Sequence, residues 1–207
     1  MDQPEPELSK IVLLNGQSVS PAATSNARWK LPFIQETMTK GRSCPPPVIA
    51  ISETWLKSYI TDAQIEIDDY QVYRSDRPDR VGGGCLLYIH DSLVVTETDC
   101  YGDRSNNMVM CYVKSCHTIF AAVYRPPGVD TAGFKKLLNQ LQEKIDAISA
   151  DNTVPDLYLL GDFNYPNKEW ESGIAENGTV RQGSYLAEFI NHNFPVSYTH
   201  LTLPTIE

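Results

Sequence analysis

The sequence predicts an α/β sandwich of two mostly mixed sheets with few helices outside them. Short apolar runs of strand length recur along the chain, and polar, turn-rich stretches separate them. Only a few segments carry a helical pattern, and the sequence shows no internal repeat. With 207 residues, 42% of them hydrophobic, the chain has the length and composition of one domain around one core.

The expected strands begin at residues 10–15, KIVLLN, an apolar run that ends in a polar turn. Residues 48–52, VIAIS, follow a run of prolines and have the continuous apolar pattern of a central strand. Five further runs of strand type follow, at residues 70–74, 84–89, 108–113, 118–124 and 157–161.

The clearest helix is expected over residues 131–150, with Asp130 as its N-cap. Its apolar residues share one helical stripe: Phe134, Leu137, Leu138, Leu141, Ile145 and Ile148. A shorter helix is expected over residues 184–191, and a weaker one over residues 26–40, where Pro32 interrupts the pattern. Residues 1–9 are polar, and we expect them to be disordered.

The net charge of −9 argues against a protein that wraps nucleic acid, because non-specific DNA affinity comes mostly from lysine and arginine. It leaves room for a nuclease with a local basic rim around an acidic centre. The five cysteines are odd in number and form no CxxC pair, which favours reduced thiols inside a cell. The N-terminus resembles no signal or transit peptide, and no apolar run is long enough to span a membrane. We therefore expect a soluble protein that is not secreted.

Polar side chains stand where four of the apolar runs end. They are Asn15, Glu53, Tyr124 and, after the last run, Asp162 with Asn164. Strand ends that gather on one edge of a sandwich bring such side chains together on a rigid base. Carboxylates, amides and a phenol suit Mg²⁺ and a phosphate group, because Mg²⁺ prefers oxygen ligands. Each residue alone has another interpretation, since Asn, Asp and Glu past a strand are most often turn formers or helix caps.

Five motifs, in this order, resemble the endonuclease domain of non-LTR retrotransposons, a relative of abasic-site endonucleases and pancreatic deoxyribonuclease. They are LLNGQS at 13–18, SETW at 52–55, GGGCLLYI at 82–89, VYRPP at 123–127 and LLGDFNYPNKEW at 159–170. Each motif is weak alone, and their order along residues 10–195 makes the resemblance specific. It implies a two-sheet sandwich of the deoxyribonuclease and abasic-endonuclease type.

The resemblance implies a role for each strand-end residue. Glu53 would be the principal Mg²⁺ ligand and Asn15 would support the metal, for which Mn²⁺ could substitute. Tyr124 would bond the scissile phosphate, Asp162 would orient the attacking water, and Asn164 would hold a phosphate oxygen. The reaction implied is DNA nicking that leaves a 3′-hydroxyl to prime reverse transcription. The partners implied are nuclear DNA and a reverse transcriptase domain in the same polyprotein, although no targeting signal is visible.

Three other features have simpler interpretations. Gln17 stands where some relatives carry an Asp, so one carboxylate of the metal region is absent. Gly82–Gly84 lack the context of a phosphate loop and fit a turn that enters a strand. His90 and His117 lack ligand-like spacing, so surface or hydrogen-bonded histidines are expected rather than a zinc site.

Residues 74–80 alternate in charge through Arg74, Asp76, Arg77, Asp79 and Arg80. This pattern is typical of a solvated loop. A basic loop near the cleft could also touch the DNA backbone.

The domain is expected to be incomplete at its C-terminal end. The resemblance implies a further Asp on a strand and a terminal Ser-Asp-His-like motif, and neither follows Asn164. Residues 196–205, VSYTHLTLPT, match the translation of a sequencing adapter, so we interpret residues 196–207 as non-native and exclude His200. The alternative is a native strand, which this composition would suit. Without the terminal histidine, we expect this chain to nick DNA weakly or not at all.

Two other functions remain open. A phosphatase or phospholipase of the same superfamily would use the same fold on inositol phosphates or sphingomyelin. A non-catalytic binding module would keep the fold without the chemistry. Retention of all five strand-end residues argues against the module, and the pairing of VYRPP with GDFNYPN favours the retrotransposon branch.

Overall fold

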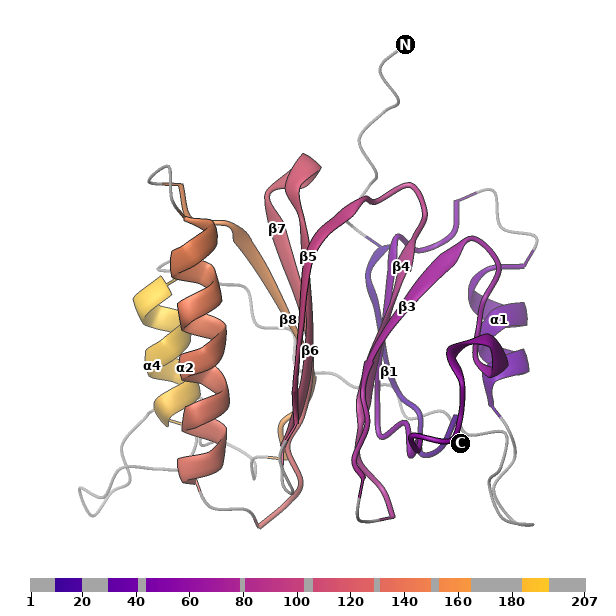
Figure 1. The fold of residues 1–207 in the computed structure, drawn as a ribbon, viewed down its shortest axis with the longest axis horizontal. Helices are drawn as coiled ribbons and strands as arrows, with labels where there is room; N and C mark the ends of the chain where they lie inside the picture. Colours follow the sequence, from indigo (N-terminus) through magenta and orange to yellow (C-terminus); the bar gives the residue numbers. More distant parts are fainter. Residues whose placement is uncertain are drawn as a thin grey trace.

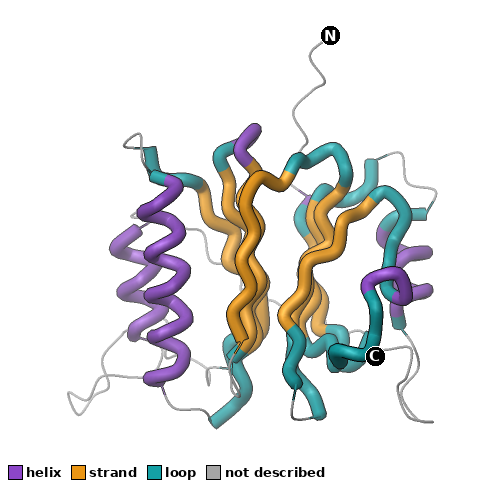
Figure 2. The backbone as a smooth tube through the Cα atoms, viewed as in Figure 1, coloured by secondary structure: helices purple, strands orange, loops and turns teal. Residues whose placement is uncertain are grey.

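The computed structural model describes residues 10–19, 30–40, 44–78, 81–102, 106–128, 131–149, 153–164 and 184–193. These residues form four layers, with α2 and α4 on one side, two sheets in the middle and α1 on the other side (Figure 1). Figure 2 shows the two sheets face to face between the helices. The predicted two-sheet sandwich is therefore confirmed.

The first sheet has the order β1-β2-β4-β3. Its strands are β1 (Val12–Asn15), β2 (Val48–Ser52), β3 (Tyr70–Ser75) and β4 (Cys85–His90). β1 runs parallel to β2, and β4 lies antiparallel between β2 and β3. Both sides of β2 are paired and all its residues are buried, as its continuous apolar sequence predicts.

The second sheet has the order β5-β6-β7-β8. Its strands are β5 (Val95–Gly102), β6 (Asn107–Val113), β7 (Thr118–Tyr124) and β8 (Asp156–Asp162). β7 runs parallel to β8, and the other pairs are antiparallel. Each sheet thus has one parallel pair, and parallel strands place their carboxyl ends at the same edge.

The strand β5 was not expected from the sequence. Its residues, VTETDCYG, are mostly exposed and lack the apolar alternation that marks a half-buried strand. Pairing with β6 along its length holds it in the sheet, so a long-range contact overrides its weak local pattern.

The helices lie close to the predicted positions. α2 (Thr131–Ile148) and α4 (Ser184–Asn193) were expected, while the proposed cap Asp130 lies outside the described residues. α1 (Leu31–Met38) begins beside Pro32, which occupies the first turn, where the missing N–H breaks no helical hydrogen bond. Pro32 therefore starts this helix instead of interrupting it. No described helix is long and apolar enough to cross a membrane.

The core has three parts. One lies between the sheets and joins residues of β2 and β4 to residues of β6 and β7. A second lies between the second sheet and α2 with α4, where all six residues of the predicted helical stripe take part. The third lies between the first sheet and α1. Close packing on both faces of each sheet holds the strands rigidly, and the residues at the strand ends therefore have a fixed base.

Candidate active site

Four predicted residues meet at the carboxyl ends of the two parallel strand pairs. Asn15 ends β1 and Glu53 follows β2, while Tyr124 and Asp162 end β7 and β8 opposite each other in the ladder. Among these four residues, two contacts join the two sheets: Asn15 Nδ2 lies 3.5 Å from Asp162 Oδ2, and the Tyr124 hydroxyl bonds the Glu53 carboxylate. With Asn164, which bonds Asp162, these residues form what we call the strand-end cluster.

The backbone fixes Glu53 from both sides. Its carbonyl accepts a hydrogen bond of 2.9 Å from the Ser18 amide, which continues the β1–β2 pairing past the strand. On the other side, the Trp55 amide donates to the Gly83 carbonyl at 2.9 Å. Glu53 and Trp55 both have positive φ, 58° and 57°, a conformation that costs free energy in residues other than glycine. The loop is thus held in an unfavourable backbone geometry that aims the Glu53 side chain.

Besides the Tyr124 hydroxyl, two further donors hold the Glu53 carboxylate. Trp55 Nε1 and the Gly83 amide donate to Glu53 Oε2 at 2.7 and 2.8 Å. The sequence reasoning assigned no role to either donor. Trp55 belongs to the SETW motif and could have been noticed there, whereas Gly83 lies 30 residues away and no local pattern links it to Glu53.

Gly83 is a glycine because nothing larger fits. Its φ is +78°, and a Cβ there would lie 2.7 Å from Tyr124 Cε1 and 2.8 Å from Arg77 Cδ. The Gly82–Gly84 turn does enter a strand as predicted, and it also packs its backbone against Tyr124 and binds Glu53.

The GDFN segment is braced to the end of β7. The Arg125 amide donates to the Asp162 carbonyl at 2.9 Å, and Asn164 Nδ2 donates to the Arg125 carbonyl at 2.8 Å. The Asn164 amide donates to Asp162 Oδ1 at 3.1 Å. At Gly161 the two strands approach so closely that a Cβ would lie 1.9 Å from the Val123 carbonyl oxygen. These contacts set the direction of the Asp162 carboxylate.

The strand-end cluster contains two acidic side chains, Glu53 and Asp162, and their surroundings shift the pKa values of Asp162 and Tyr124. Burial is the largest cause that raises the pKa of Asp162, the charge of Glu53 raises it further, and hydrogen bonds from Asn164 oppose the rise. Burial is also the largest cause that raises the pKa of Tyr124. The hydrogen bond to Glu53 and the charges of Glu53 and Asp162 raise this pKa further, and the charge of Arg77 lowers it. Tyr124 therefore keeps its proton and donates a hydrogen bond.

The donor set fits a hard divalent cation. The charge of Glu53 raises the pKa of Asp162, and a cation between the two carboxylates would offset this repulsion. Mg²⁺ commonly binds through one or two carboxylates and completes its shell with water and phosphate oxygens. Among the described residues, no group of three or more His, Cys, Asp or Glu side chains is placed to hold a metal.

The two asparagines are brought to the cluster, but their side chains have bonds of their own. Asn15 Oδ1 accepts from the Gln17 amide at 3.3 Å while its Nδ2 faces Asp162. Asn164 Nδ2 is bonded to the Arg125 carbonyl. In this structure both brace the Asp162 side of the cluster. Their predicted roles toward metal and phosphate stay predictions.

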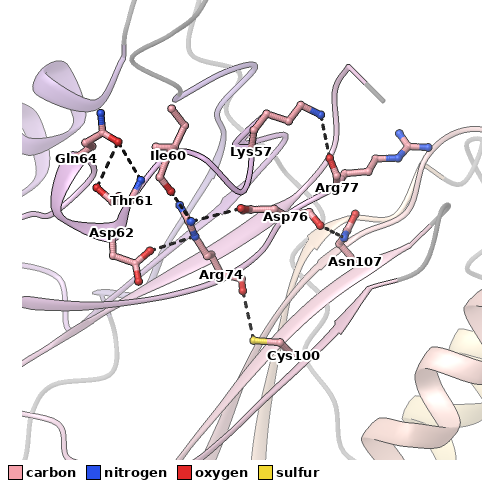
Figure 3. Close-up of polar contacts among 10 residues, drawn as sticks. All are labelled: Lys57, Ile60, Thr61, Asp62, Gln64, Arg74, Asp76, Arg77, Cys100 and Asn107. Atoms are coloured by element: carbon pink, nitrogen blue, oxygen red, sulfur yellow. Dashed lines mark hydrogen bonds and ion pairs between the residues drawn. The ribbon is translucent and has the colours of Figure 1, made fainter. Parts of the chain in front are cut away.

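The three alternating charges that the structure describes, Arg74, Asp76 and Arg77, do not lie in a solvated loop, which corrects the simpler interpretation for these residues. Arg74 belongs to β3 and bonds the Ile60 carbonyl at 2.6 Å, Asp62 at 3.1 Å and Asp76 at 3.6 Å (Figure 3). We call Asp62, Arg74 and Asp76 the Arg74 cluster. Arg77 is buried, and Asp79 and Arg80 lie outside the described residues. Charge alternation alone does not reveal burial, because the contacts of Arg74 with Asp62 and the Ile60 carbonyl come from a distant segment.

The histidines and cysteines behave as expected. His90 Nδ1 bonds Ser92, and His117 bonds the Tyr112 hydroxyl and the Thr153 carbonyl. All five cysteines are free thiols. Residues 1–9 and 196–207, and with them His200, lie outside the described residues, so their predicted disorder and non-native origin stay predictions.

Solved structures with the same fold are nucleases and phosphatases. The 3′ phosphatase NExo from Neisseria, bound to a product DNA hairpin, has a TM-score of 0.57 at 16% identity over 87% of this chain and 70% of its own. The AP endonuclease LMAP from Leishmania major has a TM-score of 0.53 at 13% identity over 89% and 65%. A mannosyl-6-phosphatase from Bacteroides thetaiotaomicron has a TM-score of 0.51 at 15% identity over 74% and 64%. This chain thus spans about two thirds of their length.

The fold is that of the endonuclease/exonuclease/phosphatase class, as the motifs predicted. Residues 118–205 match the family model named Endonuclease-reverse transcriptase, which agrees with the resemblance to retrotransposon endonucleases. No curated protein matches the chain.

Proposed function

We propose that the strand-end cluster is a Mg²⁺-dependent site for phosphodiester hydrolysis that nicks DNA. The meeting of Glu53 and Asp162 from different sheets, beside the Tyr124 hydroxyl, carries this proposal. The motif order and the family model support DNA as the substrate and a reverse transcriptase as the partner domain.

Three residues of the strand-end cluster have direct tasks in the proposed reaction. Glu53 would hold Mg²⁺, and the charge of this ion would stabilise the negative charge that develops on the phosphate oxygens. Asp162 orients a water molecule, and Tyr124 donates a hydrogen bond to a non-bridging oxygen. The water oxygen forms a bond to phosphorus while the bond from phosphorus to O3′ breaks. A proton from the water passes to O3′, which leaves a 5′-phosphate and a 3′-hydroxyl that can prime reverse transcription.

The site also suits phosphomonoesters, because the proposed metal ion and the Tyr124 hydroxyl would bind the non-bridging oxygens of a phosphomonoester as they would those of a phosphodiester. The solved structures of this fold include phosphatases by name, so this is the second candidate. Release of inorganic phosphate from a 3′-phosphorylated duplex or from inositol polyphosphates, without plasmid nicking, would favour it over the endonuclease.

The first test measures metal binding by thermal unfolding of the 207-residue chain. Mg²⁺ at 100 times its Kd stabilises a protein by about 2.7 kcal/mol, which is roughly 5–10 °C for a chain of this size. We expect this gain in the wild type and in Glu143→Gln, which removes an exposed carboxylate on α2. We expect Glu53→Gln to lose it.

Nicking of supercoiled plasmid with Mg²⁺ tests the chemistry. Weak turnover is expected of this chain, so any nicking that Glu53→Gln abolishes and Glu143→Gln retains supports the endonuclease. A wild type that gains no stability from Mg²⁺ and does not bind DNA would sink the proposal.

A further inference from the structure

The strand-end cluster lacks a positive side chain of its own, although it would have to receive a phosphate. Glu53 and Asp162 are acidic, and Tyr124, Asn15 and Asn164 are neutral. A metal ion neutralises part of the phosphate charge, and arginine is the side chain best suited to bind the remaining oxygens. The described arginines near the cluster are Arg77 and Arg125, and they are placed differently.

Arg125 braces the GDFN segment. Its Nη1 donates to the Phe163 carbonyl at 3.2 Å and the Asn164 carbonyl at 3.3 Å, and its guanidinium carbon lies 5.9 Å from the centre of the Phe134 ring. With only 1% of its surface exposed, it supports the site from within the core.

Arg77 lies against Tyr124 on the Glu53 side of the cluster. Its guanidinium carbon is 6.0 Å from the centre of the Tyr124 ring, and its charge acts on the Tyr124 hydroxyl. Arg77 Cδ and Tyr124 Cε1 flank the same face of Gly83, whose amide binds Glu53. Arg77, Tyr124 and the Glu53 carboxylate are therefore neighbours around Gly83.

The Arg77 backbone is anchored. Lys57 Nζ donates to the Arg77 carbonyl at 2.9 Å, and Asn107 Nδ2 donates to the neighbouring Asp76 carbonyl at 3.1 Å. In Figure 3 the Arg77 side chain extends away from the Arg74 cluster instead of joining it. Only 7% of the Arg77 surface is exposed, so its side chain is already largely desolvated in the folded protein. Binding a phosphate would therefore require little further desolvation of Arg77.

We propose that Arg77 is a substrate-binding residue whose guanidinium holds a DNA phosphate beside Tyr124. This rests on the proposed function and names the group that supplies positive charge from the protein itself. The net charge of −9 disfavours general attraction to DNA. A single arginine beside Tyr124 would add affinity for a phosphate at this site alone.

The test is the salt dependence of DNA binding. A short double-stranded oligonucleotide is titrated by fluorescence anisotropy at constant Mg²⁺ and increasing KCl. Each phosphate contact contributes about 0.9 to the slope of log Kobs against log salt concentration. We expect Arg77→Gln to lower that slope by about 0.9 and to weaken binding about tenfold or more. Arg77→Lys keeps the charge and loses the fork, so it should keep the slope and bind several-fold more weakly.

Lys114→Gln is the matched control. Lys114 is exposed and follows Val113, the last residue of β6. Tyr124 pairs with Asn107 at the other end of β6, so Lys114→Gln removes one charge far from the strand-end cluster. Thermal unfolding of each variant checks that it is folded. If Arg77→Gln does not fold, Arg77→Lys decides, and binding equal to the wild type would overturn the inference.

The outcomes separate the inference from the proposed function. If the wild type binds DNA with a Mg²⁺ effect that Glu53→Gln removes, and Arg77→Gln behaves like Lys114→Gln, Arg77 does not bind phosphate and the nuclease proposal stands. If the wild type does not bind DNA at any salt concentration, both fall.

Discussion

Two partly buried polar clusters of the described residues, the Arg74 cluster and the strand-end cluster, differ in charge balance. In the Arg74 cluster, one arginine stands between two aspartates and also bonds a backbone carbonyl. In the strand-end cluster, Glu53 and Asp162 come together with a phenol and two amides, and no lysine or arginine is ion-paired to either carboxylate among the ion pairs of the described residues. The first cluster pairs its arginine with both carboxylates, although Arg74 Nη1 and Asp76 Oδ1 have no hydrogen-bond partner among the described residues. The second carries acidic charge that a ligand could neutralise.

This difference separates a structural role from a functional one. A buried ion pair fixes the position of two segments, and its loss destabilises the fold. Uncompensated acidic charge at a rim destabilises the fold while it stays unbound and becomes favourable when a cation binds. Substitutions in the Arg74 cluster should therefore change stability alone, and those in the strand-end cluster should change the response to Mg²⁺.

The largest loss of stability is expected for Arg74→Met. The Arg74 and Asp76 side chains are only 17% and 15% exposed, so the change leaves a carboxylate without its cation and the Ile60 carbonyl without its donor. We expect a loss of about 3 kcal/mol in urea denaturation, the lower end for a broken buried pair.

The pH dependence of that loss has a definite sign. Burial already raises the pKa of Asp76 and Arg74 lowers it, so removing Arg74 raises it further. In acid, Asp76 is protonated and no longer needs a cation, so the difference from the wild type should shrink as pH falls. A loss that is equal at neutral and acidic pH would contradict this account.

Gly83→Ala should have the next largest effect and should act on the site. The methyl group would meet the Tyr124 ring and Arg77, and φ of +78° is unfavourable for alanine. We expect a loss of about 2 kcal/mol together with a weaker Mg²⁺ effect, because Tyr124 and the Gly83 amide both bond Glu53.

Gly128→Ala is the matched control for Gly83→Ala. Its φ is +71° and a Cβ there would meet nothing within 4 Å, so it carries the backbone cost alone, about 1 kcal/mol. Equal losses for the two variants, with Mg²⁺ responses alike, would show that Gly83 matters only for its backbone.

Most of the fold could be predicted because its apolar runs coincide with buried strands. Residues 48–52 and 118–124 have the predicted bounds, since both strands are buried along their whole length. β5 could not be predicted, because its stability comes from β6 and not from its own polar sequence. Local pattern reports burial well, and it reports edge pairing poorly.

The candidate site follows the same rule. The meeting of Glu53 and Asp162 could be predicted, because polar residues directly after apolar strands are displayed at a sheet edge. The bond from the Gly83 amide and the position of Arg77 could not, because both depend on how the turn before β4 folds back onto Glu53 and Tyr124. The positive φ values at Glu53 and Trp55 are equally invisible in the sequence.

Asp162→Asn should stabilise the metal-free protein slightly. The folded pKa of Asp162 is raised, so between the ordinary aspartate pKa and the raised value the folded state holds more protons than the unfolded state. The stability of the wild type therefore falls as pH rises through that window, and the asparagine variant escapes the fall. We expect a gain of up to about 1 kcal/mol at neutral pH, limited by solvent screening of a partly exposed carboxylate.

Urea denaturation across pH measures this gain, and Mg²⁺ should reverse it. Added metal compensates the Asp162 charge in the wild type and has less to compensate in the variant. If Asp162→Asn is less stable than the metal-free wild type at neutral pH, the hydrogen bonds of the carboxylate outweigh its electrostatic cost.

Asp62→Asn should have the smallest effect, although Asp62 forms the shorter ion pair with Arg74. Its side chain is 62% exposed, and pairs with an exposed partner contribute little. The charge of Asp62 also raises the pKa of Asp76, so its removal relieves one cost while it loses one attraction. The two terms oppose each other, and we expect a change within about 0.5 kcal/mol in urea denaturation. A loss as large as that of Arg74→Met would mean that the 3.1 Å pair, and not the buried Asp76 pair, holds the cluster together.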